Sequence, residues 1–186
     1  MRAIAVRWTT KRCRVALLFL AVLGVLISGG WLYHRWKYPY GWSHSCDKGL
    51  MFSLHQYAED HGGAYPAGEA TPEASLSLLY PKYADASLLQ GKTVPLELVE
   101  AILERGDHLG PDTCGWHYVE GLRLDDNRRL ALCWDKVGLG HNGERLLNGD
   151  RYVVFVNRSI DYIPGSKWQE FLEEQEKLQA DRKKRE

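Results

Sequence analysis

Two carboxylates and one imidazole lie close together in sequence around a glycine-rich segment. Asp135 precedes the segment, His141 lies within it and Asp150 ends it. Such groups could gather a cation or act as acid and base. The segment also contains Gly138, Gly140, Gly143 and Gly149, whose freedom is costly to fix, whereas a catalytic group must be held rigidly. We therefore predict a solvated docking loop, and keep a metal-assisted enzyme built on these three residues as the alternative.

The same segment carries the glycine spacing of a dinucleotide-binding loop. Gly138, Gly140 and Gly143 follow a strand-like run, but only residues 144–151 separate them from the next one. That length is too short for the crossover helix whose N-terminus would hold a pyrophosphate. A hairpin loop is therefore the better prediction, and we expect no nucleotide cofactor.

Two further sets of side chains could do chemistry. One set is of the types that bind zinc: Cys114, His117, Cys133 and Asp135. Zinc sites usually show paired Cys-x-x-Cys or His-x-x-x-His spacing, which these residues lack. The other set is Ser53 and His55, which have no nucleophile-elbow glycines around them and diverge on a helix. We therefore predict no metal, no cofactor and no catalytic residue, with His55 on a helix surface.

The overall charge gives no reason to expect a nucleic-acid partner. Lys and Arg together number 24, and so do Asp and Glu. Balanced charge creates no long-range field that would attract a polyanion. The chain has 186 residues, of which 45% are hydrophobic, which is enough for one ordinary core beside an anchor.

The strongest local signal is an uncharged apolar segment near the N-terminus, Val15 to Tyr33. As a helix it would be roughly 28 Å long, close to the thickness of the bilayer hydrocarbon, so we expect it to contact membrane lipid. The residues that precede it are basic, with no acidic residue among them: Arg2, Arg7, Lys11, Arg12 and Arg14. Such a flank stays in the cytoplasm, so the chain that follows would be exported across the membrane.

The far end of the apolar segment is rich in aromatic rings: Trp31, Tyr33, Trp36, Tyr38, Tyr40 and Trp42. Trp and Tyr favour the headgroup region of a bilayer. A cleaved signal peptide is the competing interpretation, because Val15 to Ile27 has the length of its apolar core and Ser28 and Gly30 suit cleavage. We favour a retained anchor, since the apolar run continues to Tyr33 and is longer than secretion requires.

Helical periodicity dominates the first half of the exported part. One apolar stripe of 3.6-residue period, followed by a stop at Gly62-Gly63, consists of Cys46, Leu50, Leu54, Tyr57 and Ala58. Thr71-Pro72 predicts the start of a short helix that runs through Leu79. Pro95 opens another helix, which runs through Leu103.

The second half changes to a period of two, typical of strands. The strand-like runs are 116–119, 130–134, 152–156 and 159–163. Ser166 and Gln169 have the spacing of a capping box for a last helix. That helix would turn four apolar side chains to the sheet: Trp168, Phe171, Leu172 and Leu178. Helices followed by an antiparallel sheet predict an α+β fold.

These features divide the chain into five expected parts. A cytoplasmic basic segment (1–14) precedes a transmembrane helix (15–33) and an aromatic juxtamembrane segment (34–45). One exported domain (46–180) and a charged tail (181–186) follow.

Export would place Cys46, Cys114 and Cys133 on the oxidising side of the membrane and leave Cys13 in the cytoplasm. Cys114 precedes one strand-like run and Cys133 lies in the next, so a hairpin could bring the two sulfurs together. We predict a disulfide between Cys114 and Cys133. Three free, buried thiols are the alternative.

Two ordered series of motifs resemble type II secretion pseudopilin-like proteins. The first series comprises Cys46, the run Tyr57-Ala-Glu-Asp-His-Gly-Gly-Ala-Tyr-Pro66 and the run Ser75-Leu-Ser-Leu-Leu-Tyr-Pro-Lys-Tyr83. The second series is similar to that family's last strands, and comprises 116–122, 130–136, His141 with Gly143, 152–156 and 161–164. The resemblance covers most of residues 46–178. It implies a pilin-like domain in which a long helix lies on a small antiparallel sheet.

The N-terminus departs from this family. Pilins and pseudopilins carry a cleavage motif of the Gly-Phe-Thr-Leu-Ile-Glu type, whereas here Arg14 is followed directly by Val15-Ala-Leu-Leu-Phe19. The glutamate that pairs with a neighbouring subunit is missing, and Asn157-Arg158-Ser159 replaces the family's Asp-Gly-His. The resemblance therefore implies a pilin-like ectodomain on an ordinary anchor.

Together these observations predict a single-pass membrane protein of the bacterial envelope. Residues 15–33 would contact lipid, and the exported domain would bind or scaffold an envelope protein, in a role related to secretion, without catalysing a reaction.

Overall fold

The computed structural model describes residues 9–43 and 45–184. It divides into two units, one ending at Tyr38 and the other beginning at Pro39. Proline disfavours a helical conformation in the residue before it and cannot donate a backbone hydrogen bond, so a helix ends readily there.

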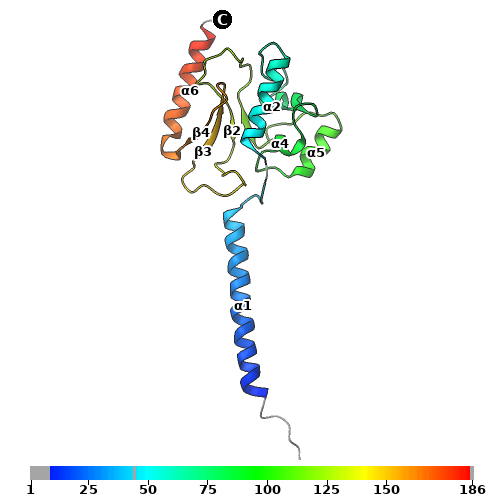
Figure 1. Ribbon diagram of the computed structural model, residues 1–186, viewed down its shortest axis with the longest axis vertical. Helices are drawn as coiled ribbons and strands as arrows, with labels where there is room; N and C mark the ends of the chain where they lie inside the picture. The colour runs from blue at the N-terminus through cyan, green and yellow to red at the C-terminus, as the bar shows by residue number, and fades with distance from the viewer. Residues whose placement is uncertain (1–8, 44, 185–186) are drawn as a thin grey trace, which may run out of the picture. The chain divides into compact units, whose positions relative to one another are not determined.

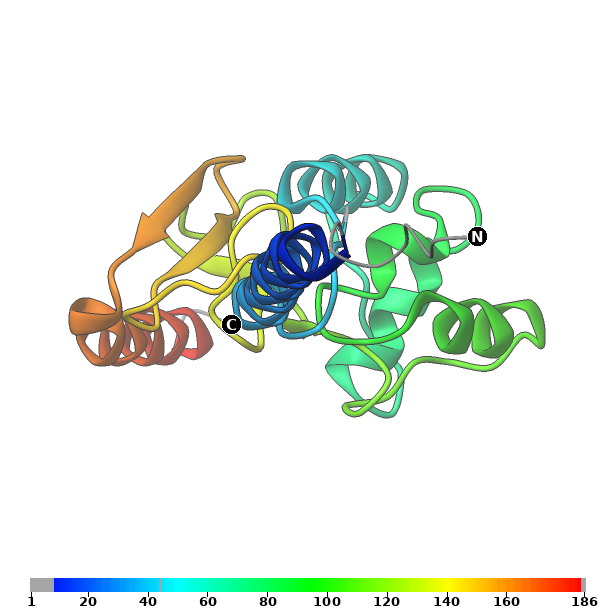
Figure 2. The ribbon, with the colours of Figure 1, turned by 90° about the horizontal axis from the view of Figure 1, so that it is seen from below.

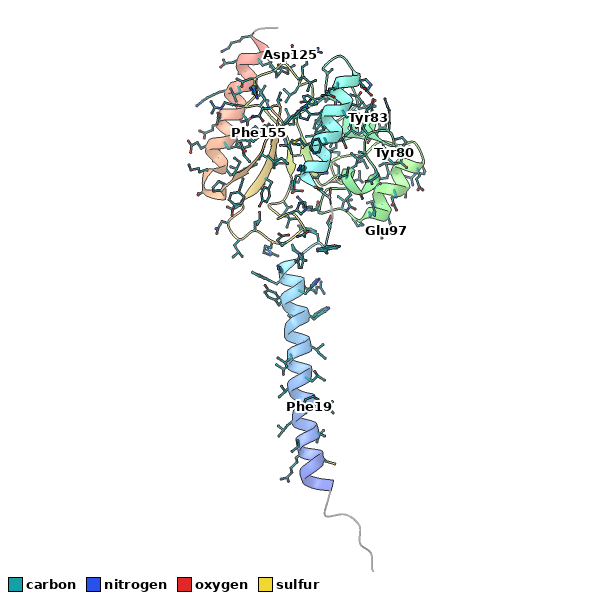
Figure 3. The ribbon with its side chains drawn as sticks, in the orientation of Figure 1. Phe19, Tyr80, Tyr83, Glu97, Asp125 and Phe155 are labelled. Atoms are coloured by element: carbon teal, nitrogen blue, oxygen red, sulfur yellow. The ribbon has the colours of Figure 1, made fainter. Side chains whose placement is uncertain are left out.

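The first unit is the helix α1, Thr9–Lys37 (Figure 1). Its described side chains from residue 13 to residue 36 are all exposed, as Phe19 illustrates in Figure 3. Within it, Cys13–Lys37 is long and apolar enough to cross a membrane, and it is the one such helix among the described residues. A signal sequence has the same properties. The predicted apolar N-terminal helix is therefore confirmed.

The second unit begins with the helix α2, Asp47–Asp60. The predicted stripe is confirmed at Leu50, Leu54 and Ala58, which are fully buried against the sheet. Gly62 and Gly63, both with positive φ, follow the helix, and the Gly63 amide donates to Ala58 O at 2.7 Å. Glycine adopts this conformation without strain, which explains why the helix stops there.

Three further short helices follow. The helix α3, Pro72–Leu76, begins after Thr71, whose Oγ1 accepts a hydrogen bond from the Ala74 amide at 3.1 Å. This is the predicted start, although the segment continues only as a 3₁₀ turn, Ser77–Leu79. The helix α4, Ala86–Leu89, was not predicted, and α5, Leu96–Glu104, follows Pro95 as expected.

The sheet contains four antiparallel strands in the order β1-β2-β3-β4. Their bounds are Trp116–Tyr118, Ala131–Asp135, Arg151–Phe155 and Ile160–Ile163. All four match predicted runs. In the register, Trp116 pairs with Asp135, and Trp134 pairs with Val153. Because side chains alternate across a strand, Trp134 points to the opposite face from Cys133 and Asp135.

A different layer covers each face of the sheet. The larger core joins one face to α2, α3, α4 and α5. The other face packs against α6, Trp168–Lys183, through a smaller cluster that includes Phe155 and Phe171. Figure 1 shows the sheet between α2 and α6, and Figure 2 shows the same arrangement from below. The α+β prediction is confirmed.

The start of α6 differs from the predicted capping box. Ser166 lies in a 3₁₀ turn, Gly165–Lys167, and no side chain caps the helix. The predicted apolar face is nevertheless present, since Phe171 is buried and both Trp168 and Leu172 pack against it. Leu178 packs against the larger core instead.

Candidate functional site

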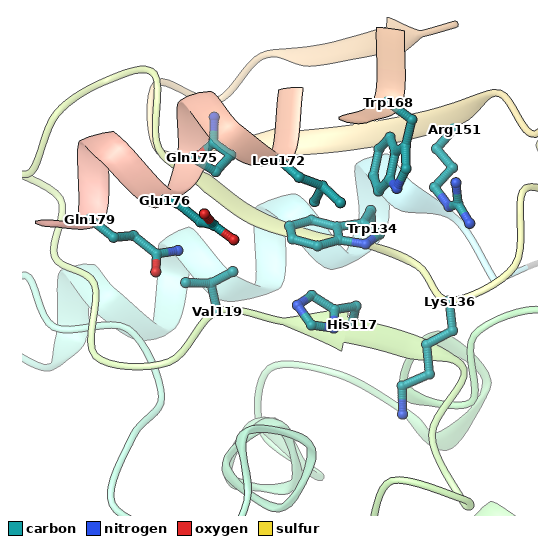
Figure 4. Close-up of a pocket in the computed structure, with 10 residues that line it drawn as sticks. All are labelled: His117, Val119, Trp134, Lys136, Arg151, Trp168, Leu172, Gln175, Glu176 and Gln179. Carbon is teal, nitrogen blue, oxygen red and sulfur yellow. The ribbon is translucent and has the colours of Figure 1, made fainter. Parts of the chain in front are cut away.

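A groove of about 380 Å³ lies between α6 and the uncovered part of the outer sheet face (Figure 4). His117, Val119 and Trp134 form its floor. Its wall is one side of α6, where the residues recur at helical spacing: Trp168, Leu172, Gln175, Glu176 and Gln179. Lys136 and Arg151 complete the lining.

Hydrogen bonds from Gln175 fix the wall of the groove. Its Oε1 accepts from the Ala131 amide at 2.8 Å, and its Nε2 donates to Arg129 O at 3.1 Å. Near the other end of α6, Arg182 Nε donates to Asp126 Oδ1 at 3.0 Å. These contacts hold α6 to β2 and to the loop between β1 and β2, so the groove is a formed feature of the fold.

Stacked rings make up much of the floor. The His117 ring stacks on Trp134 with centroids 4.2 Å apart, and Trp168 meets Trp134 edge-on at 5.7 Å. The His117 side chain is exposed at the groove surface, yet desolvation by its packed neighbours lowers its pKa and outweighs the opposing attraction of Glu73. His117 is therefore neutral at pH 7, because even its ordinary pKa lies below that value. The floor is apolar and aromatic.

Arg151 brings a positive charge to one end of the groove. Its guanidinium lies over the Trp168 ring, 4.3 Å from the centroid, and its Nη1 donates to Gly149 O at 3.2 Å. Its Nε is buried and has no hydrogen-bond partner. Burial lowers the pKa of Arg151 and outweighs the opposing attraction of Asp135, although arginine remains charged. Among the described residues, no carboxylate lies within ion-pair distance of this guanidinium.

The opposite end of the groove is negative. Figure 4 shows Glu176 and Gln179 at one end and Arg151 with Trp168 at the other. Glu176 is exposed. Lys136 contributes little net charge, because its Nζ pairs with Glu73 Oε1 at 2.7 Å and donates to Pro111 O at 2.6 Å. The groove thus has an unpaired cation at one end, an apolar middle and a carboxylate at the other end.

A second group of charges lies inside the larger core. Lys92 Nζ donates to Asp47 Oδ1 and Oδ2, at 3.0 and 3.1 Å, and also to Asp135 Oδ2. The ammonium lies 5.3 Å from the centroid of the Trp116 ring. Asp135 Oδ1 is buried without a hydrogen-bond partner. Two carboxylates therefore share one ammonium in a site shielded from water.

The protonation of this triad follows from its charges and its burial. Burial raises the pKa of Asp135 to about 7, which outweighs the attraction of Lys92. Burial alone disfavours the Lys92 ammonium, but Asp135 and Asp47 outweigh that effect and raise the pKa of Lys92. The side chains of Lys92 and Asp135 are almost completely inaccessible. The triad therefore serves to join α2, β2 and the segment after α4, and offers no surface to a substrate.

The structure does not gather the three residues of the predicted loop alternative. Asp135 points to Lys92, whereas Asp150 accepts hydrogen bonds from Tyr162 Oη and, at 2.8 Å, from the Gly165 amide. His141 is exposed. Within residues 9–43 and 45–184, no three His, Cys, Asp or Glu side chains are placed to hold a metal ion. This applies equally to Cys114, His117, Cys133 and Asp135.

The loop itself is more constrained than its glycines suggest. Residues 139 and 145 form an isolated bridge, and the Gly140 amide donates to Glu144 O at 2.7 Å. The Ser43 amide donates to Asn142 O at 3.2 Å, so the loop tip is tied to the segment before α2.

The predicted disulfide is absent, since Cys114 and Cys133 are both free and buried. The strand register explains the difference. Cys133 pairs with Tyr118, four positions beyond Cys114 on the partner strand, which is roughly 13 Å along an extended chain. Disulfides need Cα atoms within about 7 Å. Burial raises the pKa of Cys114 to about 12 and that of Cys133 well above its ordinary value.

The prediction that His55 lies on a helix surface is also wrong, because its ring is 3% exposed. Nδ1 lies 2.8 Å from Met51 O, and Tyr65 Oη lies 2.8 Å from Nε2. Nε2 also lies 3.2 Å from Val156 O. His55 is therefore a core residue that joins α2 to Tyr65.

Sequence reasoning missed Lys92, Asp47 and Arg151. Their partners lie far away in sequence, and no local spacing marks them. The sequence did predict that Trp168 and Leu172 lie on the sheet-facing side of α6, and both line the groove.

No family model matches this chain, and no similar curated protein or solved structure was found.

Proposed function

We propose that this protein is a single-pass membrane-anchored binding module of the bacterial envelope, with its N-terminus in the cytoplasm and its folded domain exported. Its partner would be another envelope protein, and it would catalyse no reaction. One observation carries the proposal. The same chain contains an exposed apolar helix and a domain whose groove has a cation at one end and a carboxylate at the other.

The anchor is argued from α1. A helix that is apolar on every side needs an apolar environment, either a protein core or lipid. The part of α1 from residue 13 to residue 36 is exposed on every side, and the domain already has its own core. Lipid is therefore the environment that suits α1. The basic residues before it favour a cytoplasmic N-terminus.

The pilin-like character of the domain is part of the same proposal. In support of it, α2 packs on a four-stranded antiparallel sheet whose strands follow one another in chain order. The motif series of residues 46–178 adds to this support. Because the prepilin cleavage motif is absent, we propose docking to a secretion-related or other envelope assembly and no filament subunit role.

Binding is favoured over catalysis by what the groove offers. Its one imidazole, His117, stacks on Trp134, and the groove lining includes no Ser, Thr or Cys that could act as a nucleophile beside it. Aromatic rings and arginine are the residue types that dominate protein-binding surfaces. The loop alternative gains no support, since Asp135 and Asp150 point to different partners.

The test is affinity capture of the full-length protein from detergent-extracted membranes of its own cells. We expect a protein partner that is retained by the wild type and by Arg128→Gln, but lost with Arg151→Gln. Arg128 is an exposed arginine outside the groove and serves as the matched control. A partner retained equally by both variants would reject the groove as the docking site.

A further inference from the structure

We propose that the groove binds an extended segment of a partner protein that presents an acidic side chain to Arg151, an apolar side chain to the floor and a basic side chain to Glu176. This inference rests on the proposed function and names the class of partner segment.

The acidic position follows from the state of Arg151. The guanidinium is held on the Trp168 ring and donates a hydrogen bond to Gly149 O. It is partly withdrawn from water, its Nε has no acceptor, and no carboxylate of the described domain pairs with it. Asp135 attracts this guanidinium without pairing with it. A carboxylate from outside the chain would supply a direct partner and form charge-assisted hydrogen bonds, which are the strongest kind that arginine makes.

The apolar position follows from the middle of the groove. Val119 and Leu172 are half-buried there, and Trp134 lies between them and the charged end. Figure 4 shows Leu172 on the α6 wall above Trp134, with Val119 on the opposite side. An aliphatic side chain placed here would displace water from these surfaces, which is favourable in proportion to the area covered.

The basic position and the spacing follow from α6. Trp168, which carries Arg151 on its face, and Glu176 are eight positions apart on this helix, or about 12 Å at the usual helical rise. An extended segment advances about 3.3 Å per residue and turns alternate side chains to the same side. Three side chains of the segment would therefore face the groove. They are an acidic residue, an apolar residue two positions later and a basic residue two positions after that.

The opposite charges at the two ends also exclude simpler ligands. A nucleic acid or another polyanion would be attracted to Arg151 and repelled by Glu176. A purely apolar segment would remove water from the Arg151 guanidinium without giving it a partner. Desolvating an unpaired charge in this way is unfavourable. A segment that carries both charges at this spacing satisfies both ends.

The experiment uses the full-length protein in nanodiscs and fluorescently labelled peptides, with binding measured by anisotropy. Two probes have the sequences Ser-Asp-Ser-Leu-Ser-Lys-Ser and Ser-Lys-Ser-Leu-Ser-Asp-Ser, because the groove can be occupied in either chain direction. A third peptide, with Asn and Gln in place of Asp and Lys, is the uncharged control. We expect one charged probe to bind at least about 10-fold more tightly than the control.

A double-mutant cycle then assigns the acidic residue to Arg151. Replacing the peptide Asp by Asn should weaken binding to the wild type about 10-fold, and so should Arg151→Gln. The two changes together should weaken it little more than either alone, because both remove one interaction. Glu176→Gln should weaken binding about 3-fold, less because Glu176 is exposed. Arg128→Gln should leave binding unchanged.

Two results would overturn the inference. One is that neither charged probe binds more tightly than the control peptide. The other is that the Asp to Asn change weakens binding equally in the wild type and in Arg151→Gln, which would place the acidic residue elsewhere. The proposed function fails separately, since loss of a captured partner with Arg151→Gln would stand even if these peptides do not bind. Retained folding of each variant is checked by its circular dichroism spectrum.

Discussion

The Lys92 ammonium donates hydrogen bonds to both carboxylate oxygens of Asp47, at 3.0 and 3.1 Å, across 45 positions of sequence. The contact joins the first turn of α2 to the segment after α4, and Asp135 of β2 binds the same ammonium. All three side chains are buried. Because water cannot reach these side chains, the fold depends on the Lys92 ammonium to neutralise the two buried acidic side chains.

Removing this charge should destabilise the domain strongly. Lys92→Met would leave Asp47 and Asp135 in the core without a counter-ion, and breaking a buried pair in this way costs about 3 to 5 kcal/mol of unfolding free energy. Lys82→Met is the control, because Lys82 forms an exposed pair with Asp60, and solvent screens such a pair so that its loss should change stability far less. Denaturant unfolding of the detergent-solubilised protein measures the change in unfolding free energy for both substitutions. Equal effects of the two substitutions would show that the buried triad is not important for stability.

The triad should also make stability depend on pH. Because the pKa of Asp135 is raised to about 7 in the folded protein, above its value in an unfolded chain, the folded state binds more protons between about pH 4 and pH 7. Stability from this group is therefore lost as pH rises through that window. The wild type should lose stability relative to Asp135→Asn between about pH 4 and pH 7.

The quantity to follow is the difference in stability between the wild type and Asp135→Asn, because the other titrating groups, including His117, are common to both proteins. Melting temperatures recorded side by side at several pH values provide it. A wild type that gains stability relative to Asp135→Asn as pH rises would show that Lys92 holds Asp135 ionised and that the direction of its pKa shift is wrong.

The cysteines of the domain should behave as inert thiols. Burial raises the pKa of Cys114 to about 12, and only the thiolate reacts readily with alkylating reagents. We expect iodoacetamide at pH 8 to leave Cys114 and Cys133 unmodified in the folded protein and to modify both after unfolding. Peptide mapping under non-reducing conditions checks this, and a peptide linked through these two residues would contradict the strand register.

The proposed topology makes a prediction of its own. Alkaline phosphatase is active only after export, so a fusion after Glu186 should be active, and a fusion at Arg14 should not. The full-length protein should resist carbonate extraction because α1 lies in lipid. A soluble full-length chain would reject the anchor, and the reverse pattern of phosphatase activity would reverse the orientation.

Local patterns were sufficient to predict most elements of the fold. The stripe of Leu50, Leu54 and Ala58 and the start of α3 after Thr71 are set by neighbours within one or two helical turns, and the structure has both. The strands were found for the same reason. The helix α4 was missed because it spans only Ala86–Leu89, too short for a periodic pattern.

The candidate site could not be predicted in this way. Arg151 and Trp168 meet because α6 folds back onto the sheet, and Lys92 meets Asp47 across 45 positions. The disulfide prediction failed on the same ground. The sequence shows that Cys114 and Cys133 lie near strand ends. It does not show the strand register that separates them, which depends on the pairing of Trp116 with Asp135.

The central claim is that the groove of an anchored, exported domain docks another protein. Photo-crosslinking in living cells tests it most directly, with p-benzoylphenylalanine placed at Glu176 in the groove or at Leu98, which is exposed on α5 outside it. We predict a crosslinked product of higher mass from position 176, identified as an envelope protein, and none from position 98. The same product from both positions, or no product from position 176, would contradict the account.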